Sequence, residues 1–156
     1  MAEIEDEQLL LDAGFERVYI ELDRYDGPRE GLAEVYGAAH YFRAAYDFAH
    51  PDASDDEYFV WPASASLLAQ EQEQWAIFVE WNTRFEAGAA LPDSHPGHGA
   101  INSRYDELTE QLVPHREVPA HARRVTAEWR LIAGARYRLD GTDYLVKWQS
   151  DGDGHR

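Results

Sequence analysis

Glu21 and Asp23 are the two residues of this chain whose types and spacing come nearest to a catalytic pair. Alternate residues on one face of a β-strand lie roughly 7 Å apart, a separation that suits two carboxylates acting as general acid and base in hydrolysis. The same alternation is also the ordinary pattern of a strand with one face in water. The sequence therefore assigns no catalytic residue, and a small two-carboxylate hydrolase is kept as an alternative.

The same segment supports binding better than catalysis. Its expected polar face, continued onto the next hairpin, combines tyrosines with carboxylates and comprises Tyr19, Glu21, Asp23, Tyr25, Glu34, Tyr36 and Tyr41. Rigid aromatic side chains are frequent anchors of protein interfaces, and negative charge attracts basic surfaces. We therefore predict a non-enzymatic interaction module of the immunity or antitoxin type. The alternative is an ordinary exposed sheet face, or one covered by the N-terminal helix.

A histidine-rich segment at residues 89–102 contains the candidate metal ligands Asp93, His95 and His98. Imidazole and carboxylate groups bind Zn²⁺ or Ni²⁺, so a small metal-dependent enzyme is a further alternative. Metal ligands usually sit on rigid elements, however, whereas a segment rich in Pro and Gly permits many geometries. The sequence favours a solvated loop here, and it predicts no metal and no other cofactor.

Negative charge is concentrated in the N-terminal part of the chain. The formal net charge is −16, with −18 on residues 1–115 and +2 on residues 116–156. Such a charge attracts basic proteins and repels polyphosphate and anionic membranes. We therefore expect a basic protein or peptide as partner, with no nucleic acid and no membrane, and we expect the C-terminal arginines to neutralise acidic residues. Adaptation of a domain of unknown role to high salt is the alternative reason for the acidity.

The segments that carry the candidate residues are expected to be strands. Residues 18–25 alternate apolar and polar side chains, which predicts a strand. Residues 31–36 and 39–46 predict a β-hairpin whose two-residue loop is Gly37-Ala38. Further strands are expected at residues 57–61, 125–131 and twice within 135–149.

This loop position sets the expected register of the hairpin. It places Val35 opposite His40 and Glu34 opposite Tyr41. Strict alternation then predicts the residues that pack beneath the long helix, namely Val18, Ile20, Leu22, Val35 and Phe42. It also predicts the tyrosines that point away from that helix, namely Tyr19, Tyr25 and Tyr41.

Residues 64–87 change to a helical period, with Ser64 as the expected N-cap and Gly88 as the exit. Shorter helices are expected within residues 3–13 and 103–113. The predicted fold class is α+β, with a mainly antiparallel sheet of six or seven strands. One long amphipathic helix, about 64–87, packs on one sheet face, and two shorter helices accompany it.

The composition predicts one folded domain over residues 1–150 and a disordered tail at 151–156. Aromatic residues make up 13% of the chain and supply a core, while the absence of cysteine excludes disulfides. The N-terminus lacks the basic and apolar regions of a signal peptide, and no apolar run approaches the roughly 20 residues that span a bilayer. We therefore expect a cytoplasmic protein, whose oligomeric state the sequence does not predict.

Short stretches spread over about half of the chain lie at residues 26–31 (DGPREG), 40–42 (HYF), 75–77 (WAI) with Trp81 and 84–85 (RF), 95–96 (HP) and 104–108 (RYDEL). On these stretches the chain resembles a set of uncharacterised small acidic bacterial proteins of similar length, which have no established function. The resemblance implies a single compact domain. It implies no catalytic residues.

Overall fold

The computed structural model describes residues 4–24, 27–46 and 52–150. Its strands are β1 (Ile4–Glu5), β2 (Glu16–Arg24), β3 (Pro28–Val35), β4 (Ala38–Ala44), β5 (Glu57–Pro62), β6 (Arg123–Ile132), β7 (Tyr137–Arg138), β8 (Gly141–Thr142) and β9 (Tyr144–Ser150). The α-helices are α1 (Glu7–Asp12), α2 (Ala65–Glu86) and α3 (Ser103–Leu112). Short 3₁₀ turns follow at η1 (Pro92–Ser94), η2 (Pro96–His98) and η3 (Val113–Arg116). None of these helices has the length and apolarity that crossing a bilayer requires.

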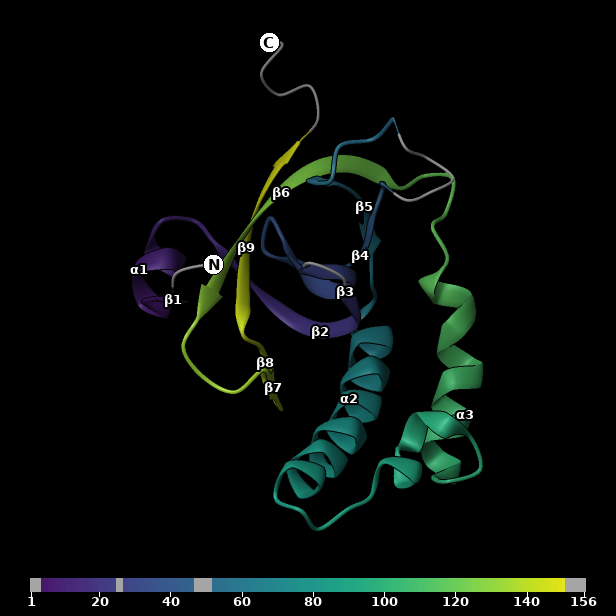
Figure 1. Cartoon of the computed structure of the whole chain (residues 1–156). Coiled ribbons are helices and arrows are strands. Elements are labelled where there is room, and N and C mark those ends of the chain that lie inside the picture. The colour runs from purple at the N-terminus through teal and green to yellow at the C-terminus, as the bar shows by residue number, and fades with distance from the viewer. Residues whose placement is uncertain (1–3, 25–26, 47–51, 151–156) are drawn as a thin grey trace.

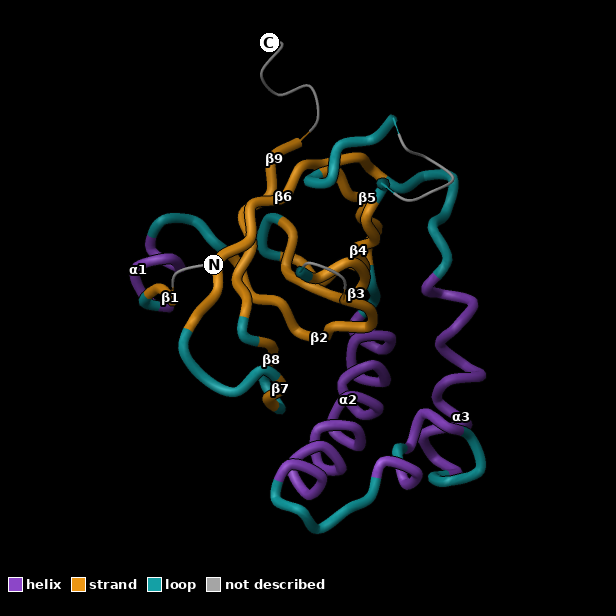
Figure 2. Tube along the Cα trace, viewed as in Figure 1, coloured by secondary structure: helices purple, strands orange, loops and turns teal. Residues whose placement is uncertain are grey.

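Six antiparallel strands close into a barrel (Figures 1 and 2). The order is β2-β3-β4-β5-β6-β9, and β9 pairs with both β6 and β2, which closes the ring. The short strand β1 adds to β6 in parallel, and β7 and β8 form a separate two-stranded sheet. The predicted α+β class and mainly antiparallel sheet are confirmed. Closure was not predicted, and it leaves few unpaired strand edges.

Large aromatic side chains fill the barrel interior. The ring of Phe42 lies 5.4 Å from that of Trp129 and 5.9 Å from that of Trp148, measured between centroids. The hydroxyl of Tyr58 donates to the carbonyl of Pro28 at 2.7 Å and accepts from the indole N–H of Trp129 at 3.1 Å. The interior is therefore apolar, and its few polar groups have partners.

A second core lies on the outer face of the barrel, where the first half of α2 packs against it (Figure 1). The predicted long helix is confirmed, and the Ser64 hydroxyl caps it by accepting from the N–H of Leu67 at 3.1 Å. The buried apolar residues of this outer layer are Ile20, Leu32, Tyr41, Trp61, Trp75 and Val79. The sheet thus buries side chains on both of its faces.

The predicted hairpin register is wrong. Val35 pairs with Ala38, so the two-residue loop is Tyr36-Gly37, and both loop residues have positive φ (52° and 84°), as a type I′ turn requires. The carboxylate of Glu16 accepts the N–H groups of Tyr36 at 2.8 Å and Gly37 at 2.7 Å. These two hydrogen bonds from the neighbouring strand β2 stabilise a turn that puts a tyrosine, rather than a glycine, at the first loop position.

The observed register is shifted by two residues from the expected one, which leaves Tyr41 on the opposite face from Phe42 and Val35, and α2 covers the face that carries Tyr41. Tyr41 pairs with Leu32 on the outer face, whereas Phe42 and Val35 point into the barrel. The side chain of Tyr41 is buried and donates to Glu71 of α2 at 2.9 Å. The expectation that Tyr41 points away from the long helix, and that Phe42 packs beneath it, is therefore wrong.

The predicted alternation of the first strand also fails. The pairing of β2 with β3 shifts between Val18 and Ile20, and again between Glu21 and Asp23. Val18 therefore faces the barrel interior while Ile20 faces α2. A β-bulge turns the residues that follow it to the other face, so a strand read as strictly alternating contributes to both cores.

Candidate functional site

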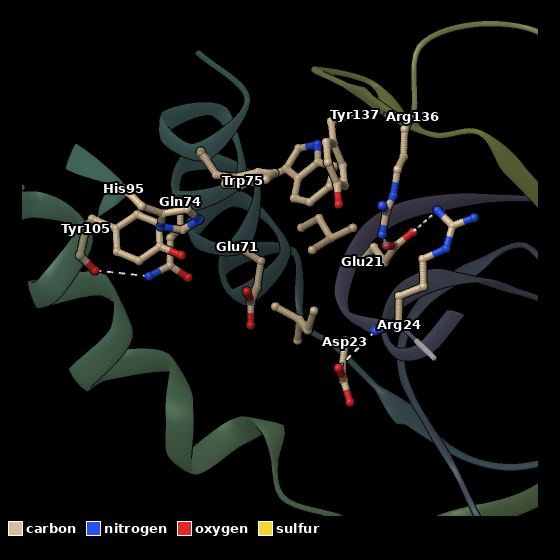
Figure 3. Close-up of a pocket in the computed structure, with 13 residues that line it drawn as sticks. Glu21, Asp23, Arg24, Glu71, Gln74, Trp75, His95, Tyr105, Arg136 and Tyr137 are labelled. Carbon is tan, nitrogen blue, oxygen red and sulfur yellow. Dashed lines mark hydrogen bonds and ion pairs between the residues drawn. The ribbon is translucent and has the colours of Figure 1, made fainter. Parts of the chain in front are cut away.

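A pocket of about 360 Å³ lies between β2, α2 and β7 (Figure 3). Residues 20–24 of β2 line one side, and Trp75, Phe78 and Tyr137 supply aromatic walls. Because of the irregularities in β2, five consecutive residues reach the pocket rather than every second one. The volume is within the range of small-ligand sites.

The position of β7 over the pocket is set by α2. The indole N–H of Trp75 donates to the carbonyl of Arg138 at 2.6 Å, and the rings of Trp75 and Tyr137 meet edge to face with centroids 5.6 Å apart. The ring of Phe78 lies 4.9 Å from that of Tyr137. These contacts join residues from the middle and from the C-terminal part of the sequence into one wall.

Glu21 holds two arginines at one end of the pocket. Its side chain is only 3% exposed, and Oε1 accepts from Nη2 of Arg136 at 2.9 Å. Nη1 of Arg24 lies 3.6 Å from Oε2 of Glu21 and 3.7 Å from Oδ1 of Asp143. The guanidinium of Arg136 also stacks over the ring of Tyr137, 4.8 Å from its centroid. Glu21 thus orients both guanidinium groups.

Glu71 is the second buried carboxylate of the pocket. Its side chain is 1% exposed, and Arg116 binds it in a bidentate manner at 2.7 and 3.0 Å. The hydroxyl of Tyr41 donates to the same carboxylate, and burial, together with the charge of Glu71, raises the pKa of Tyr41 well above its usual value. Tyr41 is therefore a fixed donor, and the network joins the barrel to α2 and η3.

Asp23 is the exposed carboxylate of the pocket. Its Oδ1 accepts the N–H of Arg24 at 2.9 Å, and it forms no ion pair with any described cationic side chain. Across the ladder it faces Glu30, whose carboxyl has a pKa raised by burial; Arg43, on the other side of Glu30, offsets part of this rise, and Asp23 adds to it. Like charges on facing residues destabilise a sheet, so an external cation is favoured at this rim.

The histidine segment does not form a metal cluster within the described part of the chain. His95 reaches the pocket, but its Nδ1 accepts the N–H of Gly97 at 2.8 Å. Burial and the neighbouring His98, whose ring lies 5.3 Å away, lower the pKa of His95. Asp93 is exposed on η1. The imidazole of His95 is instead packed on α2, 4.5 Å from the ring of Trp81.

The predicted binding residues are divided between several places. Glu21 and Asp23 meet in the pocket, as described above, and Tyr41 is buried beneath α2. Tyr19 and Glu34 are half-buried, and Tyr36 is exposed beside Glu16, at the opposite end of β2 from Asp23. Tyr25 lies outside the described residues. The correction at Tyr41 follows from the position of α2, which packs on the face of the hairpin that carries Tyr41 and not on the face that carries Phe42.

Sequence reasoning missed Glu71, Arg116, Arg136 and the aromatic wall. A signal for Glu71 was present, because this residue falls on the apolar stripe of the long helix, three residues after Leu68 and four before Trp75. A carboxylate on an apolar stripe needs a buried partner. No comparable signal marks Arg136, which depends on the position of β7.

Comparisons with protein-family models, with curated proteins and with solved structures find no match for this chain.

Proposed function

We propose that this protein is a non-enzymatic interaction module for a basic protein or peptide, and that a cationic side chain of the partner enters the pocket. The observation that carries the proposal is that Asp23, a carboxylate without an ion pair among the described residues, lines the same pocket as the aromatic side chains of Trp75 and Tyr137. Aromatic faces attract cations, and the aliphatic stems of lysine and arginine pack against them. The rim of the pocket therefore complements a basic side chain.

The charge of the whole chain supports the same partner class. Residues 1–115 carry a formal charge of −18, which raises the association rate of basic partners at low salt. The finer proposal is an inhibitor of the immunity or antitoxin type that covers a basic active site in the cytoplasm. Such an inhibitor needs charge, rigid aromatic groups and no catalytic residues of its own.

A two-carboxylate hydrolase is the second candidate, because Glu21 and Asp23 line the same pocket. Glu21 is engaged by Arg136 and flanked by Arg24, so its carboxylate serves to orient two guanidinium groups. Asp23 is then the single carboxylate of the proposed pair that is free to meet a ligand. Binding of a cation needs only this one free carboxylate, whereas two-carboxylate hydrolysis needs both.

The test is fluorescence anisotropy with a labelled peptide of alternating alanine and arginine that ends in arginine with a free carboxylate. We expect binding at low salt that weakens as salt rises, and no binding of the matched glutamate peptide. Asp23→Asn should weaken binding roughly tenfold. Asp55→Asn, which removes the same charge from an exposed turn, should weaken it less than about twofold.

Equal losses in the two variants would mean that the charge acts from a distance and that the pocket is not used. Absence of binding to the arginine peptide would overturn the proposed function. Melting the protein at low and at molar NaCl tests salt adaptation separately. A steep rise of the melting temperature with salt would favour that explanation of the acidity.

A further inference from the structure

We infer that the pocket recognises the C-terminal residue of its partner, a lysine or arginine whose free carboxylate pairs with Arg136 while its side-chain cation lies toward Asp23. This inference rests on the proposed function. It adds a second recognised group, because the pocket presents donors for an anion as well as a carboxylate for a cation.

Arg136 has donors to spare. Its side chain is 46% exposed, and its one hydrogen bond to a described residue runs from Nη2 to Oε1 of Glu21. Arg24 is less available, since its guanidinium lies between Glu21 and Asp143 and donates to the hydroxyl of Tyr144 at 3.3 Å. Arg136 is therefore the arginine of this pocket that can meet a ligand.

The guanidinium of Arg136 is also held in a defined orientation. It stacks on Tyr137, and Glu21 anchors one of its nitrogens. A planar guanidinium fixed in this way presents its remaining N–H groups as a fork that matches the two oxygens of a carboxylate. Capture of a chain-terminal carboxylate is a known mode of peptide recognition.

The two recognition groups lie at different ends of the pocket. In Figure 3, Glu21 lies between Arg136 and Asp23, and Trp75 and Tyr137 lie near Arg136 and Glu21, on the side away from Asp23. A C-terminal basic residue carries an anion and a cation separated by an apolar stem, so its carboxylate can meet Arg136 while its cation lies toward Asp23. An internal basic residue offers only the cation, and a pocket of about 360 Å³ suits a single residue.

Isothermal titration calorimetry with four defined ligands tests the inference. The ligands are an acetylated tetrapeptide ending in arginine as the free acid, the same peptide as the C-terminal amide, its permutation with arginine at an internal position, and L-arginine. We expect the free acid to bind at least tenfold more tightly than the amide or the permutation. L-arginine should bind more weakly than the free-acid peptide, because it has a charged α-ammonium group in place of the amide bond to the preceding residues.

Variants locate the carboxylate contact. Arg136→Gln should reduce the preference for acid over amide to about twofold or less, while Asp23→Asn should weaken both ligands by the same factor. Arg124→Gln is the matched control, since Arg124 is similarly exposed and also pairs with a glutamate, Glu57. It should leave the preference unchanged. Unchanged far-ultraviolet circular dichroism would verify that each variant is folded.

The outcomes separate the two claims. Equal affinity of the wild type for acid and amide would overturn the inference and leave the proposed function standing. Failure of every peptide to bind would overturn the proposed function itself. Tighter binding of L-arginine than of the acid peptide would assign the pocket to a free amino acid and overturn recognition of a partner's C-terminus.

Discussion

The barrel interior and the outer layer are built on the two faces of one sheet, yet they differ in chemistry. The interior is a cluster of aromatic and aliphatic side chains around Phe42, in which the polar atoms of Tyr58 and Trp129 bond to each other. The outer layer buries the carboxylates of Glu21 and Glu71, each paired with arginine. The site lies in the second region.

The two regions differ because water and arginine side chains can reach the outer layer but not the barrel interior. The closed ladder surrounds the interior with hydrogen-bonded backbone, so a charge placed there would lack both water and partners. The helices cover only part of the outer face, and arginines from distant segments reach the carboxylates there. Arg116, Arg124 and Arg136 all pair with acidic residues of the N-terminal part, which confirms the expected neutralisation. Stability and recognition are therefore assigned to different faces.

The largest expected effect is in the barrel interior. Phe42→Ala should lower the free energy of unfolding by about 4 kcal/mol, because it leaves a cavity among the three aromatic rings of Tyr58, Trp129 and Trp148. Urea denaturation monitored by tryptophan fluorescence measures this. Phe85→Ala, at a side chain that is 38% exposed, should cost under about 1.5 kcal/mol. Similar costs at the two sites would contradict the assignment of stability to the interior.

The next effect tests the ion pair of the outer layer. Glu71→Gln should cost about 3 kcal/mol, because Arg116 is left buried with no opposite charge. The double variant Glu71→Met/Arg116→Met should recover at least half of that loss, since it removes both charges together. Denaturation of the wild type, the single variants Glu71→Met and Arg116→Met, and the double variant gives the coupling energy. Simple additivity would show that the two charges do not depend on each other.

A smaller effect is expected from the hydroxyl of Tyr41. Tyr41→Phe removes its bond to Glu71 but keeps the stacking on Trp61, whose ring lies 5.6 Å away. The loss should be about 1.5 kcal/mol, as for a buried bond to a charged group. Tyr36→Phe, at the exposed turn, should change stability by less than about 0.5 kcal/mol. Equal effects would contradict the burial of Tyr41 beneath α2.

The smallest effect concerns pH. Burial raises the pKa of Glu30 above its ordinary 4.5, so its stabilising contribution is complete below pH 4.5 and is lost as pH rises through the raised value. Glu30→Gln should therefore melt at a higher temperature than the wild type at pH 7, with the difference shrinking toward pH 4.5. Melting curves across this range measure it.

Glu57 provides the control of opposite sign. The N–H of Ser54 and Arg124 lower the pKa of Glu57, so its contribution is present above pH 4.5 and is lost as pH falls. Glu57→Gln should melt at a lower temperature than the wild type at pH 7. A shift of the same sign in both variants would show that removal of any negative charge, rather than burial, governs the response.

Several features followed from the sequence because they depend on near neighbours. The α+β class, the antiparallel strands and the bounds of α2 rest on side-chain periodicity and on a capping serine that accepts the N–H of the residue three positions on. The charge of each part of the chain is likewise a property of composition. The burial of Glu71 could have been predicted on the same grounds, because this carboxylate falls on the apolar stripe of the long helix.

Other features required the tertiary structure. Glu16 fixes the turn at Tyr36 from twenty residues away, and the bulge in β2 depends on pairing with β3. A shift of one residue turns a side chain to the other face, so the bulge decided which residues of β2 line the pocket, while the packing of α2 on the outer face of the barrel decided that Tyr41 is buried. Closure of the barrel and the meeting of Glu21 with Arg136 join segments over 100 residues apart. No local pattern encodes such contacts, because their energy comes from partners that only the folded chain brings together.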